Sequence, residues 1–333
     1  MATLDIFNED PFRVTGLTAA INQSPEGQQV PDLLDGLFEE EGVSTTTVFI
    51  ERDHDGLALV PAGERGGPGE PVSGSQRDAL PFRTLHLPTR ATVYADEVQG
   101  IRAFGSESEL ETVEQLVARR LAKMRARLDA TLRFHRIGAV TGKIYDADGS
   151  KVLLDAYNRF AITQQSLSFA LATASTKIKG KITDAKRLAE DVIADSGVIT
   201  GWLGVCGRNW MDAFSSHDNV EKAFDRWQDG SFLRTDNRNG FDFAGVSWRE
   251  YYGKVGSISF IDPDTAYLIP LGVSGLFISR FAPADYMETV NTLGIPYYAS
   301  MEMLPHNKGV ELEAQSNPLN LCTRPRAIIK LTL

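Results

Sequence analysis

The clearest pattern in the chain is a stripe of apolar residues that begins after Ser106 and runs to Leu132. Apolar residues recur in steps of three and four, which indicates a helix with one buried face: Leu110, Val113, Leu116, Val117, Leu121, Met124, Leu128 and Leu132. Ser106 and Glu109 have the spacing of a capping box, and acidic residues precede basic ones, which suits the helix dipole. We predict a helix over residues 107–136, about 45 Å long, ended by Gly138.

Two β-rich stretches precede this helix, Thr45–Arg52 and Phe82–Tyr94. Between them, Pro61–Asp78 contains five glycines and three prolines and almost no apolar side chains, so it cannot form a core and is expected to be an exposed tip. If the two flanks pair, they form a hairpin that reaches roughly 45 Å. An isolated two-stranded ribbon is marginal in water, so this hairpin needs a surface to lie on.

Shorter elements follow the long helix. Residues 139–160 predict a hairpin that turns at Asp146–Gly149. From Thr183 the pattern is α/β, with helices at 184–195, 208–217 and 218–228 and strands at 198–205, 241–252, 257–262 and 265–270. The tail predicts a pair of strands, Val310–Ala314 and Arg326–Leu333. Residues 1–44 have little periodicity, apart from one or two amphipathic helical turns around Leu33–Phe38.

Composition describes an acidic globular protein. The 333 residues are 42% hydrophobic and 23% charged, with a formal net charge of −10, enough for one large domain or two ordinary ones. Residues 1–50 contain a single basic residue, Arg13, which argues against wrapping nucleic acid through phosphate contacts. The acidic segment 31–55 has two interpretations: a solvated face, or an extended arm that packs on a neighbouring subunit.

Nothing in the sequence predicts secretion or membrane insertion. Residues 1–5 lack the charged and apolar regions of a signal peptide, and the apolar run Ile269–Ile278 is too short to span a bilayer. Cys206 and Cys322 are the only cysteines. We interpret them as reduced core thiols of a cytoplasmic protein, with a bridge between them left open.

A search for chemistry yields no catalytic residue, metal site or cofactor site. The five histidines lie at least 32 residues apart, so no local metal-binding motif occurs. Asp53-His54-Asp55 is the best candidate cluster, but an acidic loop of this kind is usually just solvated. Asp146-Ala147-Asp148-Gly149 begins like a calcium loop and lacks the later ligands, while the Ser247 region lacks the closing glycine of a nucleophile elbow.

Three separated blocks resemble the lambda-type major capsid protein E family: Gly138–Gly149 directly after the long helix, Ala282–Thr292 leading to Gly294–Ala299, and Glu313–Leu319 followed by Arg324–Ala327 and the last apolar strand. The resemblance implies an α+β fold of the Hong Kong phage capsid type. It divides the chain into an N-terminal arm (1–45), an extended loop (46–98), a peripheral domain (99–180 and 271–333) with the spine helix 107–136, and an axial domain (181–270).

The same resemblance implies a structural role in a virion, with no cofactor. The partners would be other copies of the chain, in hexamers and pentamers, with portal and scaffold proteins during assembly in the host cytoplasm. A decoration protein is left open, and DNA is only the contents of the shell. The expected contact residues are those of the glycine-rich tip and two arginines of the helix: Glu64, Arg65, Gly66, Gly67, Gly69, Arg120 and Arg127.

Three alternatives stay open on sequence alone. An encapsulin-type shell that holds cargo enzymes has the same fold class, and the contents of the particle would distinguish it. A soluble α/β enzyme could assemble its site from distant residues, and a small uniform oligomer with a deep pocket would favour it. A virion-associated adaptor or decoration protein would occur at low copy number.

Overall fold

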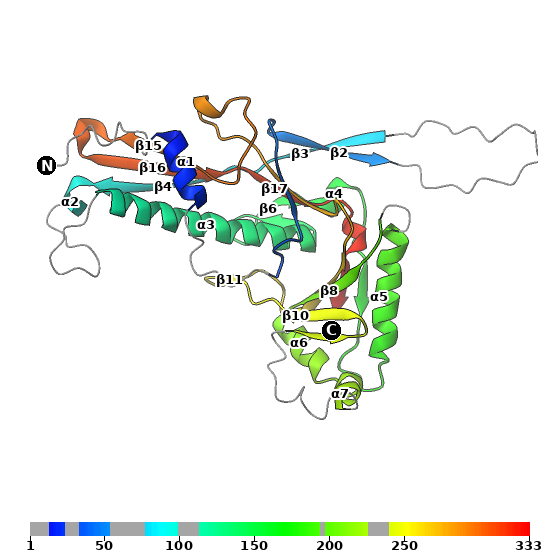
Figure 1. Cartoon of the computed structure of the whole chain (residues 1–333). Helices are drawn as coiled ribbons and strands as arrows, with labels where there is room; N and C mark the ends of the chain where they lie inside the picture. The colour runs from blue at the N-terminus through cyan, green and yellow to red at the C-terminus, as the bar shows by residue number, and fades with distance from the viewer. Residues whose placement is uncertain (1–12, 24–32, 54–76, 99–112, 194–196, 226–239) are drawn as a thin grey trace, which may run out of the picture.

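The computed structural model describes residues 13–23, 33–53, 77–98, 113–193, 197–225 and 240–333. Two lobes are visible in Figure 1. One is elongated and follows the long helix α3 (Val113–Thr141); the other surrounds a six-stranded sheet. A ribbon of two strands projects from the first lobe, on the side away from the start of α3 (Figure 1).

Helix α3 buries the stripe that its sequence pattern predicts. Its apolar side chains pack on a three-stranded sheet whose order is β15 (Tyr298–Met303), β16 (Gly309–Ser316) and β4 (Leu87–Tyr94). The buried positions of the stripe are Leu116, Val117, Leu121, Met124, Leu128 and Leu132. The predicted first turns, residues 107–112 with the capping box before them, lie outside the described residues.

The predicted end of this helix is wrong by one turn. Gly138 lies inside α3, which continues to Thr141, and Gly142 follows with a positive φ of 87°. A Cβ atom on Gly138 would stand 2.8 Å from the Lys143 carbonyl oxygen and 2.9 Å from the Ile144 Cα. Gly138 is therefore needed for the close approach of the next strand to the helix, while Gly142 supplies the left-handed residue that ends it.

The hairpin before α3 forms, but with a different partner strand. Strand β2 (Thr47–Asp53) pairs antiparallel with β3 (Arg77–Arg83), which begins before the predicted stretch 82–94. The rest of that stretch is β4, which pairs with β16 at the far end of the chain. A β-rich pattern identifies strands and cannot identify partners, because both pairings bury similar side chains.

Smaller elements join the lobes. Strands β5 (Lys143–Tyr145) and β6 (Val152–Asp155) form the predicted hairpin, and α4 (Ala156–Arg159) follows it. A second three-stranded sheet contains β1 (Glu39–Gly42), β14 (Phe277–Phe281) and β17 (Pro318–Cys322).

The second lobe confirms the predicted α/β pattern. Its helices are α5 (Ile178–Ile193), α6 (Arg208–Ser215) and α7 (Asp218–Asp225), of which α5 begins six residues before its predicted start at 184. The sheet has the order β7 (Ser166–Ser168), β18 (Ile329–Thr332), β13 (Thr265–Leu271), β8 (Gly201–Cys206), β10 (Val246–Glu250) and β9 (Phe241–Phe243). Trp210 fills the space between α6 and this sheet, with ring centroids 4.8 Å from Phe214 and 5.3 Å from Trp248.

The predicted pairing of the two tail strands is wrong. Strand β16 lies between β15 and β4 in the first lobe, whereas β18 pairs with β13 and β7 in the second. Strands β7 and β18 thus come from outside the segment 181–270. The predicted strand 257–262 is shorter than expected: only β12 (Ile258–Ser259) lies within it, and it forms a short hairpin with β11 (Lys254–Val255).

The N-terminal region contains a helix that the sequence did not predict, α1 (Val14–Gln23), which buries Leu17, Thr18 and Ile21. Residues 33–37 form turns and not a helix, although Leu34 and Phe38 are buried as the amphipathic pattern suggested. The short helix α2 (Ala95–Val98) follows β4.

Candidate assembly surface

The ribbon of β2 and β3 has apolar side chains on both faces. Cross-strand partners share a face, so the pairs Val48–Phe82 and Ile50–Leu80 form one face and the pair Phe49–Pro81 belongs to the other. Phe82 is 1% exposed in a cluster with Phe160, and Val48, Ile50 and Leu80 are only partly covered. Phe49, on the opposite face, is 62% exposed.

The base of the ribbon is held firmly by the body. Arg159 of α4 donates to the Pro81 carbonyl oxygen at 2.6 Å and places its guanidinium over the Phe82 ring. Beyond β3, the Leu85 amide donates to the Pro318 carbonyl oxygen at 2.9 Å, and the His86 Nδ1 lies 2.8 Å from Asn317 Oδ1. A base that is bonded to the body on one face and exposes Phe49 on the other suits a ribbon that docks on another molecule.

The predicted contact residues fall into two groups. Those of the glycine-rich tip (Glu64, Arg65, Gly66, Gly67 and Gly69) lie outside the described residues. The two arginines lie on α3, where Arg120 forms an ion pair with Glu97 of α2 at 2.8 Å. Arg127 is exposed, and among the described residues its guanidinium has no ion-pair partner, so it is available to a neighbouring chain.

In the acidic segment before the ribbon, Glu39, Glu40 and Glu41 are exposed, as the solvated-face interpretation expects, and they are also bonded within their own chain. Packing of this segment on a neighbouring subunit stays a prediction. Strand β1 runs parallel to β14. Each of its glutamates meets a described partner: Glu39 accepts from the Gly275 amide at 2.6 Å, Glu40 from the Arg136 guanidinium, and Glu41 pairs with Arg280 at 3.1 Å. Cations from α3 and β14 therefore hold this part of the predicted arm on the first lobe.

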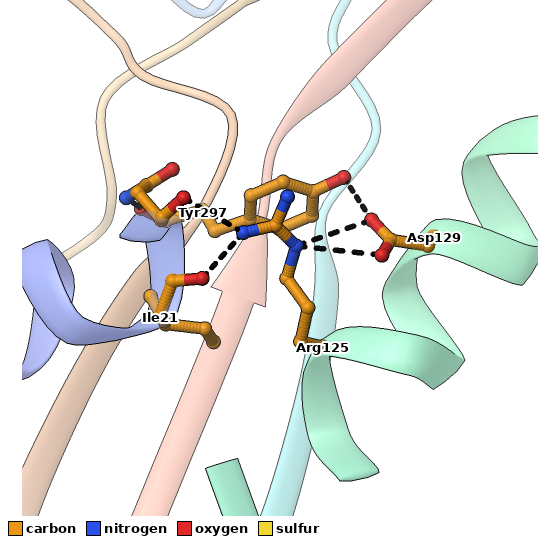
Figure 2. Close-up of polar contacts among 5 residues, drawn as sticks. Ile21, Arg125, Asp129 and Tyr297 are labelled. Carbon is orange, nitrogen blue, oxygen red and sulfur yellow. Dashed lines mark hydrogen bonds and ion pairs between the residues drawn. The ribbon is translucent and has the colours of Figure 1, made fainter. Parts of the chain in front are cut away.

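Figure 2 shows a second set of polar contacts within the chain, which holds α1 against α3. Arg125 donates to the carbonyl oxygens of Ile21 and Asn22 in the last turn of α1, the latter at 3.2 Å, and to the Asp129 carboxylate at 3.4 Å. Its guanidinium lies 4.2 Å from the Tyr297 ring centroid, and the Tyr297 hydroxyl donates to Asp129. Burial, and then the Asp129 charge, raise the pKa of Tyr297.

Sequence reasoning missed this cluster. The only signal was the spacing of Arg125 and Asp129, four residues apart on a helix, which occurs on many exposed faces. Here the two side chains are 12% and 11% exposed, because α1 and Tyr297 lie against them. A buried arginine that caps helical carbonyls while pairing with a carboxylate fastens three segments far apart in the sequence.

Helix α1 also covers part of a sheet edge. The Thr18 hydroxyl accepts from the Ala299 amide at 3.2 Å and donates to the Ala299 carbonyl oxygen at 3.3 Å. The Asn22 amide group donates to the Tyr297 carbonyl oxygen at 2.9 Å. Side chains of α1 thus take the place of a neighbouring strand along the first residues of β15.

Among the described residues, no group of three or more His, Cys, Asp or Glu side chains is placed to hold a metal ion. Cys206 and Cys322 are buried and unbridged, and burial raises the pKa of both thiols. Asp53 ends β2, while His54 and Asp55 lie outside the described residues. Within the described chain, no helix has the length and apolar content needed to cross a membrane.

Solved structures with this fold include phage capsid proteins. The putative capsid protein of a prophage of E. coli CFT073 superposes with a TM-score of 0.56 at 12% identity, over 97% of this chain and 99% of that one. The mature capsid of bacteriophage PhiM1 gives a TM-score of 0.53 at 13% identity, over 92% of this chain and 88% of that one. The predicted Hong Kong phage-type capsid fold is confirmed.

The sequence places the protein more narrowly within this class. A model of the family described as phage major capsid protein E matches residues 13–333, and the chain belongs to that family. The major capsid protein of Pseudomonas phage KPP10 is 27% identical over 97% of both chains. That of Salmonella phage Felix O1 is 26% identical over 88% of this chain and 89% of its own. The chain is therefore a structural protein of a phage capsid and not an enzyme, and the family favours a phage head over an encapsulin-type shell.

Proposed function

We propose that the chain is the major subunit of the icosahedral head of a tailed phage, and that it assembles with copies of itself into hexamers and pentamers around packaged DNA. The family supports assembly of a shell. The observation that carries the proposal is the ribbon of β2 and β3, which projects from the first lobe and exposes Phe49 on the face away from its own core cluster.

We assign the assembly roles by the segments that the sequence predicts. In this proposal the arm (1–45) and extended loop (46–98) contact neighbouring copies, and the axial segment (181–270) gathers around five- and six-fold centres. The peripheral segments (99–180 and 271–333) supply the firm base from which the ribbon projects. Neighbours would also meet the exposed Arg127, and assembly in the host cytoplasm would involve portal and scaffold proteins.

The net charge of −10 supports the role of a container. A strongly basic wall would hold phosphates through many ion contacts and would resist the entry of a long DNA molecule. An acidic subunit with only local basic groups would enclose the packaged DNA without binding it tightly. A decoration protein on the outer surface is compatible with this arrangement and is not required by it.

A first experiment examines the purified wild-type protein by negative-stain electron microscopy beside sedimentation velocity. Closed shells, or rings of five and six subunits, are the expected result. A small uniform oligomer that does not grow with concentration, nor when scaffold protein from a phage lysate is added, would contradict the proposal.

The ribbon is then tested by Phe49→Asp. Because Phe49 is 62% exposed and contributes nothing to the core, the subunit should keep its circular dichroism spectrum and melting temperature. Shell formation should be lost, since a carboxylate would be buried in the contact. Phe49→Tyr, which keeps the ring, is the matched control and should assemble. Normal shells from Phe49→Asp would remove the ribbon from the proposed contacts.

A further inference from the structure

Among the described residues, part of one edge of the sheet of β15, β16 and β4 has no backbone partners. In antiparallel strands, alternate residues direct both backbone groups at the neighbouring strand. The Leu304 amide donates to the Gly309 carbonyl oxygen at 2.9 Å, and the register of β15 on β16 continues from there. Ser300 and Glu302 therefore bond to β16, whereas Ala299, Met301 and Met303 direct their N–H and C=O groups outward.

Helix α1 covers only the first part of this edge. Thr18 satisfies both backbone groups of Ala299, and Asn22 satisfies the Tyr297 carbonyl oxygen. No described residue bonds to the outward groups of Met301 or Met303. Side chains of α1 therefore satisfy the outward backbone groups of this edge as far as Ala299. From Met301 to Met303, where α1 no longer reaches, the edge is open to another strand.

The opposite edge of the same sheet is protected. The Ala95 amide donates to the Lys308 carbonyl oxygen at 3.1 Å, which places Pro88 and Arg90 of β4 among the outward-facing residues. Proline has no N–H to offer, and a charged residue on an edge disfavours pairing. The open half of β15 has no proline, and the two residues that direct their backbone groups outward are methionines, with the one charged residue, Glu302, between them.

Charge indicates what kind of strand would fit. Glu302 of β15 lies directly opposite Glu311 of β16, an unfavourable like-charge pair. The nearby Arg90 lies 2.7 Å from Glu313 and 4.0 Å from Glu311, and Glu302 has no ion-pair partner among the described residues. A partner strand with Lys or Arg beside Glu302 would relieve this repulsion.

We propose that the edge of β15 from Met301 to Met303 accepts an extended, basic segment of a second copy of the chain, as an added strand, and that α1 confines the pairing to this half. The inference rests on the proposed function, because a shell brings many copies of this edge next to other copies. Main-chain bonds to Met301 and Met303 would hold the segment, and Glu302 would select for a cation.

The test is Met301→Pro beside Met301→Ala. Proline removes an N–H that no described residue uses, and Ser300 before it is already in a strand, so the subunit should fold. We expect Met301→Pro to lower the yield of shells about tenfold or more relative to Met301→Ala, which keeps the N–H and loses the same side chain. Equal yields from the two variants would overturn the inference.

Amide hydrogen exchange on the wild-type protein gives a second readout that does not depend on how the variants fold. The amides of Met301 and Met303 should exchange at least about tenfold more slowly in shells than in subunits, because they become bonded. Those of Ser300 and Glu302, bonded to β16 in both states, serve as internal controls. Unchanged exchange at Met301 and Met303 in intact shells would overturn the inference and leave the proposed function standing. Failure of the wild-type protein to form shells would instead overturn the proposed function.

Discussion

Replacing Arg125 by methionine should release α1 from the first lobe without disturbing the rest of α3. Methionine keeps an unbranched apolar stem and loses the guanidinium. The variant loses the bonds to Ile21 and Asn22, the pair with Asp129 and the contact with the Tyr297 ring. It leaves Asp129, which is 11% exposed, with the Tyr297 hydroxyl as a donor and without the Arg125 guanidinium.

The expected magnitude follows from this burial. Removal of one member of a buried ion pair costs roughly 3–5 kcal/mol. Because the Tyr297 hydroxyl still donates to Asp129, we expect the lower end of this range, about 3 kcal/mol. Both side chains are almost fully covered, so solvent screening reduces the effect little.

The assay is urea denaturation of the unassembled subunit, followed by tryptophan fluorescence and circular dichroism together, so that coincident transitions test for a two-state process. Arg127→Met is the matched control, since Arg127 lies two residues away, is exposed and has no described ion-pair partner; its effect should stay below about 0.5 kcal/mol. Combining Arg125→Met with Asp129→Asn should cost about 1 kcal/mol less than the two single changes together.

One result would refute this reasoning. If Arg125→Met lowers the free energy of unfolding by less than about 1 kcal/mol, in the same range as Arg127→Met, then the cluster in Figure 2 does not hold α1 in place. The boundary that α1 sets on the β15 edge would then lose its support as well.

Two further predictions concern the turn of α3 that meets β5. Burial lowers the pKa of His135 from 6.5 to about 4, so the unfolded chain takes up the proton first as the pH falls. The free energy of unfolding of the wild-type protein should therefore fall by up to about 3 kcal/mol between about pH 6.5 and pH 4. His135→Gln should not show this loss when melting temperatures are compared over the same pH range. Gly138→Ala should lower the free energy of unfolding, measured by urea denaturation, by about 1–3 kcal/mol. The alanine Cβ would stand 2.8 Å from the Lys143 carbonyl oxygen, which outweighs the preference of alanine for helices. A neutral or stabilising result would mean that β5 moves freely away from the helix.

Local periodicity determined most of the elements of this protein. The stripe of α3, the turn at 146–149 and the helices of the second lobe were all predicted because a helix or tight hairpin makes its hydrogen bonds within a short segment. The family resemblance likewise depended on short blocks, and it led to the fold and to the class of protein that the comparisons confirmed.

Only the tertiary structure decided which distant segments meet. Strand β4 pairs with β16 and not within the hairpin, β18 pairs with β13 and not with β16, and Gly138 serves a close approach and not a helix end. Helix α1 is short, and it is held by the burial of Leu17 and Ile21 and by hydrogen bonds of Arg125, Thr18 and Asn22 that no local pattern predicts. Strand pairing and buried charge depend on partners that lie far apart in the chain, and a pattern along the chain carries information only about its own neighbourhood.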